Sequence, residues 1–540
     1  ALIQHKISEM IAAQGVYVLT DDLMRDKEVS LSGVNYLSQW SYPNRIMKSA
    51  TWVAEEKQNI QYIQLTSFGC GPDAFIMDEV QTILRNHGKT LTLLKIDDVN
   101  NIGSLKLRVR SLIESLRTTV QEKTEHKPDA ISLPPFTKSY FKRKIIVPFF
   151  TPFISPLIPS IMKLAGYDTD ILPMSDNTSC DWGLKFSNNE ICYPATLIIG
   201  DIIKAFKSGV YNPDTTCVAM TQTGGQCRAS NYIPLIRKAL IEEGYTDTPV
   251  ISATFDSGIK NGQPGFKVNW LKMLPVTLNA ILYSDCIARF YYAALVREKT
   301  QGATDRLREK YLDAAKVSIG NNRPDELSVH LSCAAAEFNS ICRNEEHPKV
   351  GIVGEIFLKY HPFAQKHVTN WLAAQGIEVV YPSLADFFMQ SFVNAKYNKR
   401  SNIGNRFLPD FIIDFFYKKV QRQLDKINAH GSEFRYFIPF DNIFEKAEQA
   451  GKAISLSAQF GEGWLIAGEV AMLARQGISH IISLQPFGCI ANHIVEKGIE
   501  NRLKSLYPKL NILSLDFDSS ISEVNITNRL LLFINNLQNK

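Results

Sequence analysis

The sequence predicts an α/β fold with repeated Rossmann-like domains, in which helices flank parallel sheets, and a mainly helical connecting region. Short β-rich runs alternate along the chain with segments of helical periodicity, which is typical of β–α–β units. An internal repeat supports this fold class. The segment 67–70 (SFGC) has a near-copy at 486–489 (PFGC), and an aspartate and an arginine follow both copies at equal spacing. One structural unit is therefore expected to occur twice.

The elements of the two copies are predicted in chain order. Residues 61–68 are β-rich and lead into a Gly-Cys-Gly-Pro turn, whose proline suits the first turn of a helix over 73–86. A second strand is expected at 90–96. Residues 478–515 show the same order of strand, cysteine turn, helix and strand.

Three further β–α–β units are predicted. Two of them are similar, since 144–150 (KIIVPFF) and 350–357 (VGIVGEIF) each precede a helix, a glycine turn and a short strand. The third begins at 216–221 (TCVAMT), turns at 224–227 (GGQC) and ends in a strand at 249–255. Strands that alternate with helices favour parallel sheets covered by helices.

The length of 540 residues is too great for one ordinary core, so several domains are expected. The expected organisation is an α/β piece over 1–117, a polar linker over 118–137, an α/β domain with Cys192 and Cys227 over 138–267, a mainly helical region over 268–345, and a second α/β domain with Cys489 over 346–540. The apolar stretch 145–162 is broken by four prolines, so we expect a buried strand, a loop and a helix start there rather than a membrane span.

The composition excludes some classes of protein. A net charge of +5 gives no electrostatic basis for a nucleic-acid or membrane partner. Nine cysteines in a chain of this length are too sparse for a disulfide scaffold, and no secretory signal is present. A reducing cytoplasm is the expected location.

Four cysteines lie where ligands bind in such sheets, at the points where strands end and helices begin. Cys70, Cys227 and Cys489 follow predicted strands, and Cys192 precedes a helix whose first turn contains Pro194. A helix N-terminus lowers the pKa of a thiol and favours the thiolate, which is a ligand for soft metals.

The glycines in two of these turns, Gly225 and Gly488, would let backbone amides approach the cysteine sulfur atoms. No CxxC pair is present, so the pattern is not typical of zinc. Three dispersed cysteines, Cys192, Cys227 and Cys489, suit an iron–sulfur cluster that leaves one iron open. The alternative is that a lone cysteine is a small buried apolar residue, which is the interpretation for Cys217, Cys286, Cys333 and Cys342. Cys180 is expected in a polar loop.

Other polar residues have two interpretations each. Glu355 follows a strand end and is either a proton donor facing the cleft or a surface carboxylate. Arg228 either holds an anion or cluster sulfur beside Cys227 or forms a structural salt bridge. Asp516 and Arg529 are expected to form a structural pair, because both recur in the N-terminal copy of the repeat.

Three motifs and the Cys70 turn together resemble the 2-hydroxyacyl-CoA dehydratase superfamily. The motifs are 183–195 (GLKFSNNEICYPA), 221–232 (TQTGGQCRASNY) and 486–493 (PFGCIANH). The chain looks most like the dehydratase-like region of large acyl-CoA dehydratase activase-related proteins, which are related to double-cubane cluster proteins. The resemblance covers roughly 36–115 and 140–535.

The resemblance implies a low-potential iron–sulfur protein of anaerobic metabolism, with a [4Fe–4S] cluster or part of a double cubane. It implies that a separate or upstream ATP-dependent activator with an actin-like fold supplies an electron, which is used for reductive or radical chemistry on an acyl-CoA or a small molecule. Cys192, Cys227 and Cys489 fall on the family's cluster-ligand positions, and Cys70 on that of a preceding half. The ligands that would complete that half are absent, so the chain is expected to be a fragment or a processed product. It contains no nucleotide site of its own.

Three functions remain open at this stage. The chain is an iron–sulfur oxidoreductase or dehydratase component, an electron-relay or regulatory partner of an activase without substrate chemistry, or a non-metal binding protein with vestigial cysteines. A dimer is compatible with each of them.

Overall fold

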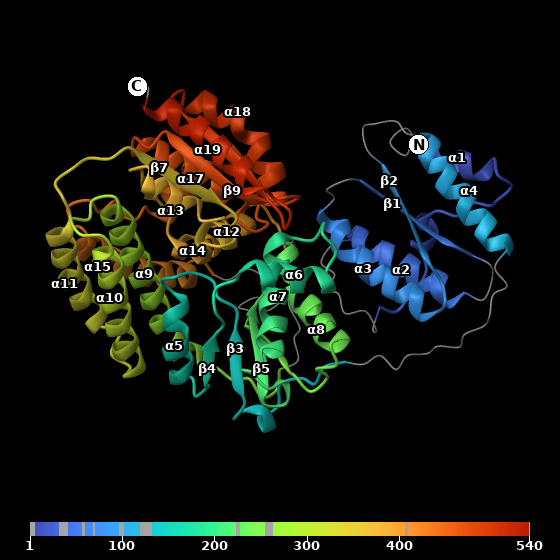
Figure 1. Ribbon diagram of the computed structural model, residues 1–540, viewed down its shortest axis with the longest axis horizontal. Coiled ribbons are helices and arrows are strands. Elements are labelled where there is room, and N and C mark those ends of the chain that lie inside the picture. The colour runs from blue at the N-terminus through green and yellow to red at the C-terminus, as the bar shows by residue number, and fades with distance from the viewer. Residues whose placement is uncertain are drawn as a thin grey trace. The chain divides into compact units, whose positions relative to one another are not determined.

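The computed structural model describes residues 6–31, 41–56, 60–67, 71–96, 102–118, 132–222, 227–253, 263–404 and 409–538. The helices flank three sheets of parallel strands (Figure 1), which confirms the α/β fold class. The chain forms two compact units. The first consists of Ala1–Leu133, Lys185–Ile191 and Arg228–Thr246, and the second consists of Pro134–Leu184, Cys192–Cys227 and Asp247–Lys540. The linker expected over 118–137 falls largely outside the described residues.

The first unit contains a two-stranded parallel sheet, in which β1 pairs with β2 from Tyr62↔Leu91 to Ser67↔Ile96. Helix α3 connects the two strands, and its buried face packs on α2 through Val80 and Leu84. The elements of this unit are α1 (Ile7–Ala12), η1 (Asp21–Met24), α2 (Ser41–Glu55), β1 (Tyr62–Ser67), α3 (Gly71–Asn86), β2 (Leu91–Ile96), α4 (Ile102–Thr118), η5 (Arg228–Asn231) and α8 (Tyr232–Glu242).

The second unit begins with a four-stranded parallel sheet in the order β4-β3-β5-β6. Phe136, Ile145 and Ile251 belong to the apolar cluster that buries its central strands. Its elements are η2 (Lys138–Tyr140), β3 (Lys144–Val147), η3 (Ser155–Leu157), α5 (Ile158–Leu164), β4 (Thr169–Ile171), α6 (Asn177–Phe186, whose last two residues belong to the first unit), α7 (Tyr193–Lys207), η4 (Pro213–Thr215), β5 (Thr216–Thr221) and β6 (Val250–Ala253).

A second four-stranded parallel sheet of the same unit has the order β10-β9-β7-β8, which is the same topology traced from the other edge. Strand β9 is buried along its whole length because it has a partner strand on both sides. The elements are β7 (Lys349–Gly354), α12 (Ile356–Tyr360), α13 (Val368–Ala374), β8 (Glu378–Val380), α14 (Leu384–Arg400), α15 (Asp410–Gly431), α16 (Ile443–Ala450), α17 (Gly463–Arg475), β9 (His480–Pro486), η6 (Ile490–Glu496), α18 (Lys497–Leu506), β10 (Asn511–Phe517) and α19 (Glu523–Gln538).

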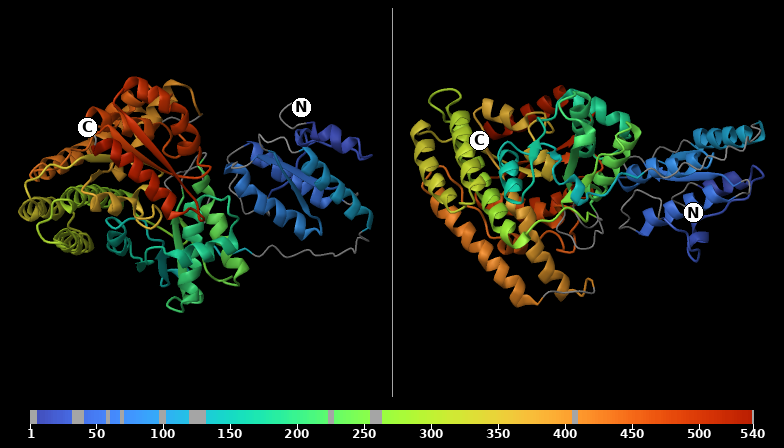
Figure 2. Two further views of the ribbon diagram at one scale, coloured as in Figure 1. Left: turned by 45° about the horizontal axis from the view of Figure 1, so that its top comes forward. Right: turned by 90° about the horizontal axis from the view of Figure 1, so that it is seen from below.

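Three helices connect the two sheets of the second unit. They are α9 (Trp270–Leu295), α10 (Ala303–Gly320) and α11 (Glu326–Ile341), and they pack on one another and, in the case of α9 and α11, on α15 (Figure 2). A buried Arg297 at the end of α9 donates to Glu378 on β8 at 2.7 Å, so the helical group is fixed to the second sheet by a buried ion pair.

The segments that follow the carboxyl ends of the two sheets contact each other. After β3, Phe150 stacks on Phe357 of α12 with ring centres 6.2 Å apart. After β4, the Ser175 hydroxyl lies 3.3 Å from His361 Nε2 and donates to Asp201 at 2.6 Å. Both sheets therefore present their carboxyl ends to a common region of the second unit.

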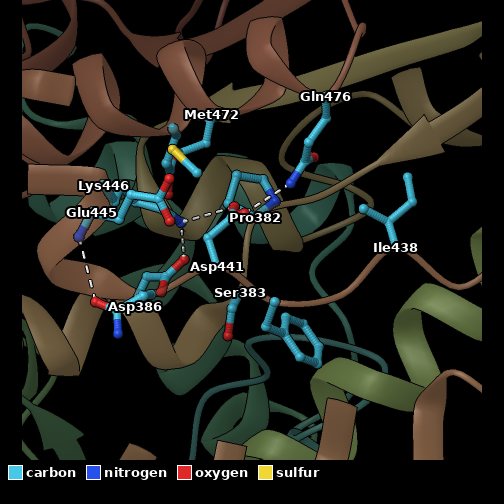
Figure 3. Close-up of polar contacts among 12 residues, drawn as sticks. Pro382, Ser383, Asp386, Ile438, Asp441, Glu445, Lys446, Met472 and Gln476 are labelled. Atoms are coloured by element: carbon cyan, nitrogen blue, oxygen red, sulfur yellow. Dashed lines mark hydrogen bonds and ion pairs between the residues drawn. The ribbon is translucent and has the colours of Figure 1, made fainter. Parts of the chain in front are cut away.

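A buried ionic network fixes the helices that cover the second sheet. Lys446 on α16 pairs with Asp386 on α14, and its ammonium lies 4.0 Å from Asp441, which accepts from Gln476 (Figure 3). A second buried pair joins Lys359 to Glu469 on α17 at 2.9 Å. Removing one partner of such a pair leaves an uncompensated buried charge, so each pair constrains the packing of its helices.

Three local expectations are wrong. Cys333 is exposed, because the buried stripe of α11 runs through Leu331, Ala334 and Phe338 and leaves Cys333 on the opposite face. Cys180 lies on the buried face of α6 rather than in a polar loop.

The third concerns the expected pair of Asp516 and Arg529. Asp516 instead pairs with Lys497 at 3.0 Å, and Arg529 donates to the Ser514 carbonyl at 2.7 Å. Cys217, Cys286 and Cys342 are buried as expected.

Candidate functional site

Each four-stranded sheet has one switch point, which is the place between two neighbouring strands from which the chain adds further strands in opposite directions. In the first sheet this point lies between β3 and β5, and in the second it lies between β7 and β9. Open parallel sheets bind ligands outside the carboxyl ends of the strands at such points. Cys227 follows β5 and Cys489 follows β9, so both cysteines lie beside a switch point.

The turn that ends β9 determines the position of Cys489. The Cys489 backbone N–H donates to the Pro486 carbonyl at 3.1 Å, and Gly488 between them has a φ of 71°. A side chain is strongly disfavoured at this φ, which explains the glycine. Gly488 N–H also donates to His493 Nδ1 at 3.1 Å. The predicted cysteine turn is therefore present, with Cys489 at the N-cap of the following segment.

The segment after Cys489, η6, is a π-helix rather than the expected α-helix. The Cys489 carbonyl accepts from both His493 N–H at 2.8 Å and Ile494 N–H at 3.3 Å. Single π-helical turns are rare and occur frequently at functional sites. The wider turn directs Asn492 and Glu496 into the protein, where both side chains are buried.

Cys227 lies beside this turn. Gly461, just before α17, has a φ of 59°, and a Cβ atom added to it would lie 3.8 Å from Cys227 Sγ and 3.8 Å from Ala491 Cβ. Ala491 is the second residue after Cys489, so Cys227 Sγ and the segment that follows Cys489 both lie at van der Waals distance from the position that a side chain at Gly461 would occupy. The structure thus places Cys227 Sγ near the segment that begins after Cys489.

Cys192 is the N-cap residue of α7, and Pro194 occupies the first turn as predicted. Its carbonyl accepts from Ala195 N–H at 2.8 Å. Burial, together with the neighbouring Cys180, raises the pKa of the adjacent Tyr193, and the charge of Asp518 after β10 contributes to the same effect. The Tyr193 side chain, at the start of α7, therefore lies close enough to Asp518 for an electrostatic interaction. Asp518 follows the carboxyl end of β10, which is the end of the second sheet where Cys489 also lies.

Two carboxylates border the same switch point. Glu355 follows β7 and caps α12 by accepting from Leu358 N–H at 2.9 Å, while Glu462 accepts from Ile356 N–H at 2.7 Å. Burial and, second, the charge of Glu462 raise the pKa of Glu355 to about 8, and burial raises the pKa of Glu462 as well. At neutral pH the pair therefore holds at least one proton. Glu462 directly follows Gly461, the residue next to Cys227.

Two buried amides also lie next to Cys489. Asn492 accepts from Cys489 Sγ at 3.2 Å, and its Nδ2 has no hydrogen-bond partner in the described part of the chain. Gln485 at the end of β9 is fully buried, and within the same described ranges neither of its amide atoms has a partner. Sequence reasoning missed Glu462, Gln485 and Asn492. Only Asn492 gave a signal, because it lies three residues after Cys489.

The structure leaves three other predicted site residues untested. Gly225 and Cys70 lie outside the described residues. Arg228 belongs to the first unit, where its guanidinium lies 5.9 Å from the ring centre of Phe75 on α3. A role for Arg228 at the cysteines stays a prediction.

The described residues contain no group of three His, Cys, Asp or Glu side chains close enough together to hold a single metal ion. In a cubane cluster each cysteine binds a different iron, so its ligands need not converge on one point. No helix within the described ranges has the length and apolar character needed to cross a membrane. Searches against protein-family models and curated proteins found no match for the chain.

Proposed function

We propose that the chain is an iron–sulfur protein that accepts a low-potential electron and uses it for reductive or radical chemistry on an acyl-CoA or a small molecule. The observation that supports it most is the position of Cys227 Sγ, which lies next to Gly461 together with Ala491, the second residue after Cys489. Cys192 would complete the ligand set from the start of α7.

The residues present fit such a cluster. The donors are thiols at turns and at a helix N-terminus, which favours the thiolate form that iron binds. Gly461 leaves space beside Cys227 where any other residue would place a Cβ. Asn492 holds a buried N–H group that has no partner in the described part of the chain. When bound, the cluster would supply single electrons at low potential.

The protein's own groups would supply the protons. Reducing a carbonyl group, or losing a hydroxyl group as water, consumes a proton for each negative charge that develops. Glu462 is buried and Glu355 partly buried, and the pair shares at least one proton at neutral pH and borders the same switch point as Cys489. A proton on this pair lies at the carboxyl end of β7, where a substrate in the cleft would meet it.

The electron donor in this proposal is an ATP-hydrolysing activator with an actin-like fold, as the sequence resemblance implies. The substrate class rests on the same resemblance. Cys227 is only partly buried, which is consistent with access to the site from solvent.

The first test is anaerobic purification and reconstitution with iron and sulfide, followed by iron analysis, sulfide analysis and electron paramagnetic resonance of the reduced protein. We expect several irons per chain and a low-spin signal on reduction. A colourless chain without iron would overturn the proposal. Turnover of an acyl-CoA with an activator and ATP would then distinguish an enzyme component from an electron relay, because the relay would be reduced but would not transform substrate.

A further inference from the structure

The second unit contains a cavity that shares no residue with the candidate site. Its walls come from α9, from the end of β8 and the residues after it, and from the segment after β3. Figure 3 labels two residues of the wall, Pro382 and Ile438. The cavity has a volume of about 40 Å³. A water molecule needs roughly 10–15 Å³ of such space, so there is room for about three waters or for a small organic molecule.

Most of the cavity wall is apolar or aromatic. Helix α9 contributes Ser284, Ala288 and Tyr292 at four-residue spacing, so one face of this helix lines the cavity. Two tyrosine hydroxyl groups of the wall, those of Tyr360 and Tyr436, already donate to backbone carbonyl groups at 2.9 and 3.0 Å. A ligand in the cavity would therefore pack mainly on apolar and aromatic groups.

Three charged side chains line the cavity, and two of them already have strong partners. Glu378 pairs with the buried Arg297 at 2.7 Å. Asp285 accepts from the Ser383 hydroxyl at 2.5 Å and also from a backbone N–H group of α14. The third is Arg289, which forms no ion pair with any residue that the structure describes.

The Arg289 guanidinium is held in place but keeps unused donors. It stacks on Phe440 at 3.8 Å from the ring centre and donates to the carbonyl groups of Ile438 and Tyr381. An arginine has five N–H groups, and Nε of Arg289 has no hydrogen-bond partner within the described ranges. Backbone carbonyl groups carry no net charge, so no contact compensates the positive charge.

Carboxylates at longer range do not supply this contact. Burial lowers the pKa of Arg289, and the charges of Asp441, Asp285 and Asp386 oppose this effect. Asp386 pairs with Lys446 instead, and the same ammonium lies 4.0 Å from Asp441 (Figure 3). These carboxylates keep the guanidinium charged, but its N–H groups in the cavity still lack an anionic acceptor.

We infer that this cavity binds a small carboxylate with a short apolar chain. The carboxylate oxygen atoms accept from Arg289, because a guanidinium matches a carboxylate in charge and in hydrogen-bond geometry. The chain packs on the aromatic and aliphatic wall. The inference goes beyond the proposed function and does not depend on it, since the cavity contains none of the proposed cluster ligands.

Three ligands of equal size test the charge of the site in the chain as purified, with or without iron. Propionate carries a negative charge, propionamide is neutral and propylammonium is positive. In a ligand-observed NMR titration at constant ionic strength, we expect propionate to bind with a dissociation constant of roughly 1–10 mM, which is typical of a ligand this small. Propionamide should bind roughly tenfold more weakly, and propylammonium should not bind. Equal affinity for propionate and propionamide would overturn the inference, as would the lack of saturable propionate binding, which would leave a cavity that holds water only.

Variants of the wall test where the ligand lies. Arg289→Met removes the charge and keeps an apolar stem, so propionate affinity should fall by roughly tenfold or more. Ala288→Leu fills the cavity from the same helix and leaves Arg289 in place, and it should cause a similar loss. Arg308→Met on α10 is the matched control, because Arg308 also stacks on a tyrosine, Tyr291, but lies outside the cavity wall.

The control should bind propionate like the unaltered protein. Undiminished binding in Arg289→Met would refute the inference, and so would undiminished binding in Ala288→Leu. If circular dichroism shows that Arg289→Met does not fold, Ala288→Leu alone decides. A chain that binds no iron but binds propionate would overturn the proposed function and support this inference.

Discussion

The strands that lead to the two Phe-Gly-Cys segments belong to different sheets. Strand β9, which leads to Cys489, is paired on both sides and buried throughout, whereas β1, which leads to Cys70, pairs only with β2 among the described strands. Leu65 in β1 is 36% exposed, while Leu484, its counterpart in β9, is fully buried. The same sequence motif therefore follows a strand of a four-stranded sheet in one copy and, among the described strands, a strand of a two-stranded sheet in the other.

This difference shows that the motif alone does not make a site. The C-terminal turn lies beside a switch point because β7 extends the sheet past β9, and β7 also brings Glu355. Helix α17 then brings Glu462 and is preceded by Gly461. The described part of the N-terminal copy has no strand equivalent to β7, so we expect the chemistry in the C-terminal copy only.

The largest effect is expected from the cysteines themselves. Cys227→Ala removes one of three proposed ligands, so the reconstituted protein should lose nearly all of its iron. Cys70→Ala should leave the iron content unchanged. Iron and sulfide analysis of both variants provides the measurement. An equal loss of iron in Cys70→Ala and Cys227→Ala would contradict the expectation that only the C-terminal copy holds a cluster.

The buried ionic network should contribute far more to stability than a surface pair of the N-terminal unit. Lys446→Met keeps the apolar stem but leaves Asp386 buried without its partner, so we expect a loss of about 3–5 kcal/mol in unfolding free energy. Asp21→Asn breaks a partly exposed pair with Arg45 and should cost less than about 1 kcal/mol. Urea unfolding followed by circular dichroism measures both. Equal losses would mean that the network does not stabilise the second sheet.

Two glycines, one near the C-terminal site and one in the N-terminal unit, allow the backbone packing of these two regions to be compared. Gly354 at the end of β7 has a φ of 120°, and a Cβ atom there would lie 2.1 Å from the Leu484 carbonyl oxygen. Gly354→Ala combines backbone strain with overlap and should cost about 2–5 kcal/mol. Gly15 in the N-terminal unit has a φ of 79° and no atom within 4 Å of the added Cβ. Gly15→Ala should therefore cost only about 1–2 kcal/mol. Thermal unfolding midpoints provide the measurement, and a smaller effect for Gly354→Ala would contradict the close approach of β7 and β9.

The last prediction concerns the pH dependence of stability. The pKa of Glu355 is raised to about 8, so the folded protein binds this proton more tightly than the unfolded chain does. Its contribution is fully present below the ordinary glutamate pKa and is lost as the pH rises toward about 8, at up to about 1.4 kcal/mol per pH unit. Glu355→Gln cannot titrate, and its amide oxygen can still cap α12. Urea midpoints at several pH values should therefore fall less steeply in Glu355→Gln. An identical slope would show that Glu355 has the same pKa in the folded and the unfolded protein.

Much of the fold was predictable because its signals are local. The cysteine turn before η6, the proline in the first turn of α7 and the broken apolar stretch that became β3, η3 and α5 all depend on a few neighbouring residues. The exposure of Cys333 could also have been predicted, because the apolar residues of α11 recur at helical spacing and Cys333 falls between them.

The rest of the site depends on contacts between distant parts of the chain. Glu462 lies far from Glu355 in sequence, and the two carboxylates meet only because α17 packs on β7. Gly461 and Cys227, which lie next to each other, are also far apart in the sequence. The π-helix could not be predicted, since η6 has ordinary helix-forming residues and the hydrogen-bond partners of its buried Glu496, Ser483 and Ser514, lie on other elements.

The π-helical turn has a consequence for how this site tolerates deletions. A π-helical turn is an α-helical turn with one residue inserted, so deleting one residue from η6 would restore the shorter ring of backbone hydrogen bonds. Every side chain beyond the deletion would rotate by about 100° around the helix axis. Glu496, which now accepts from Ser483 on β9 and Ser514 on β10, would turn away from both strands. Although Ile494 is exposed, the length of this segment is therefore expected to be invariant wherever the site is retained.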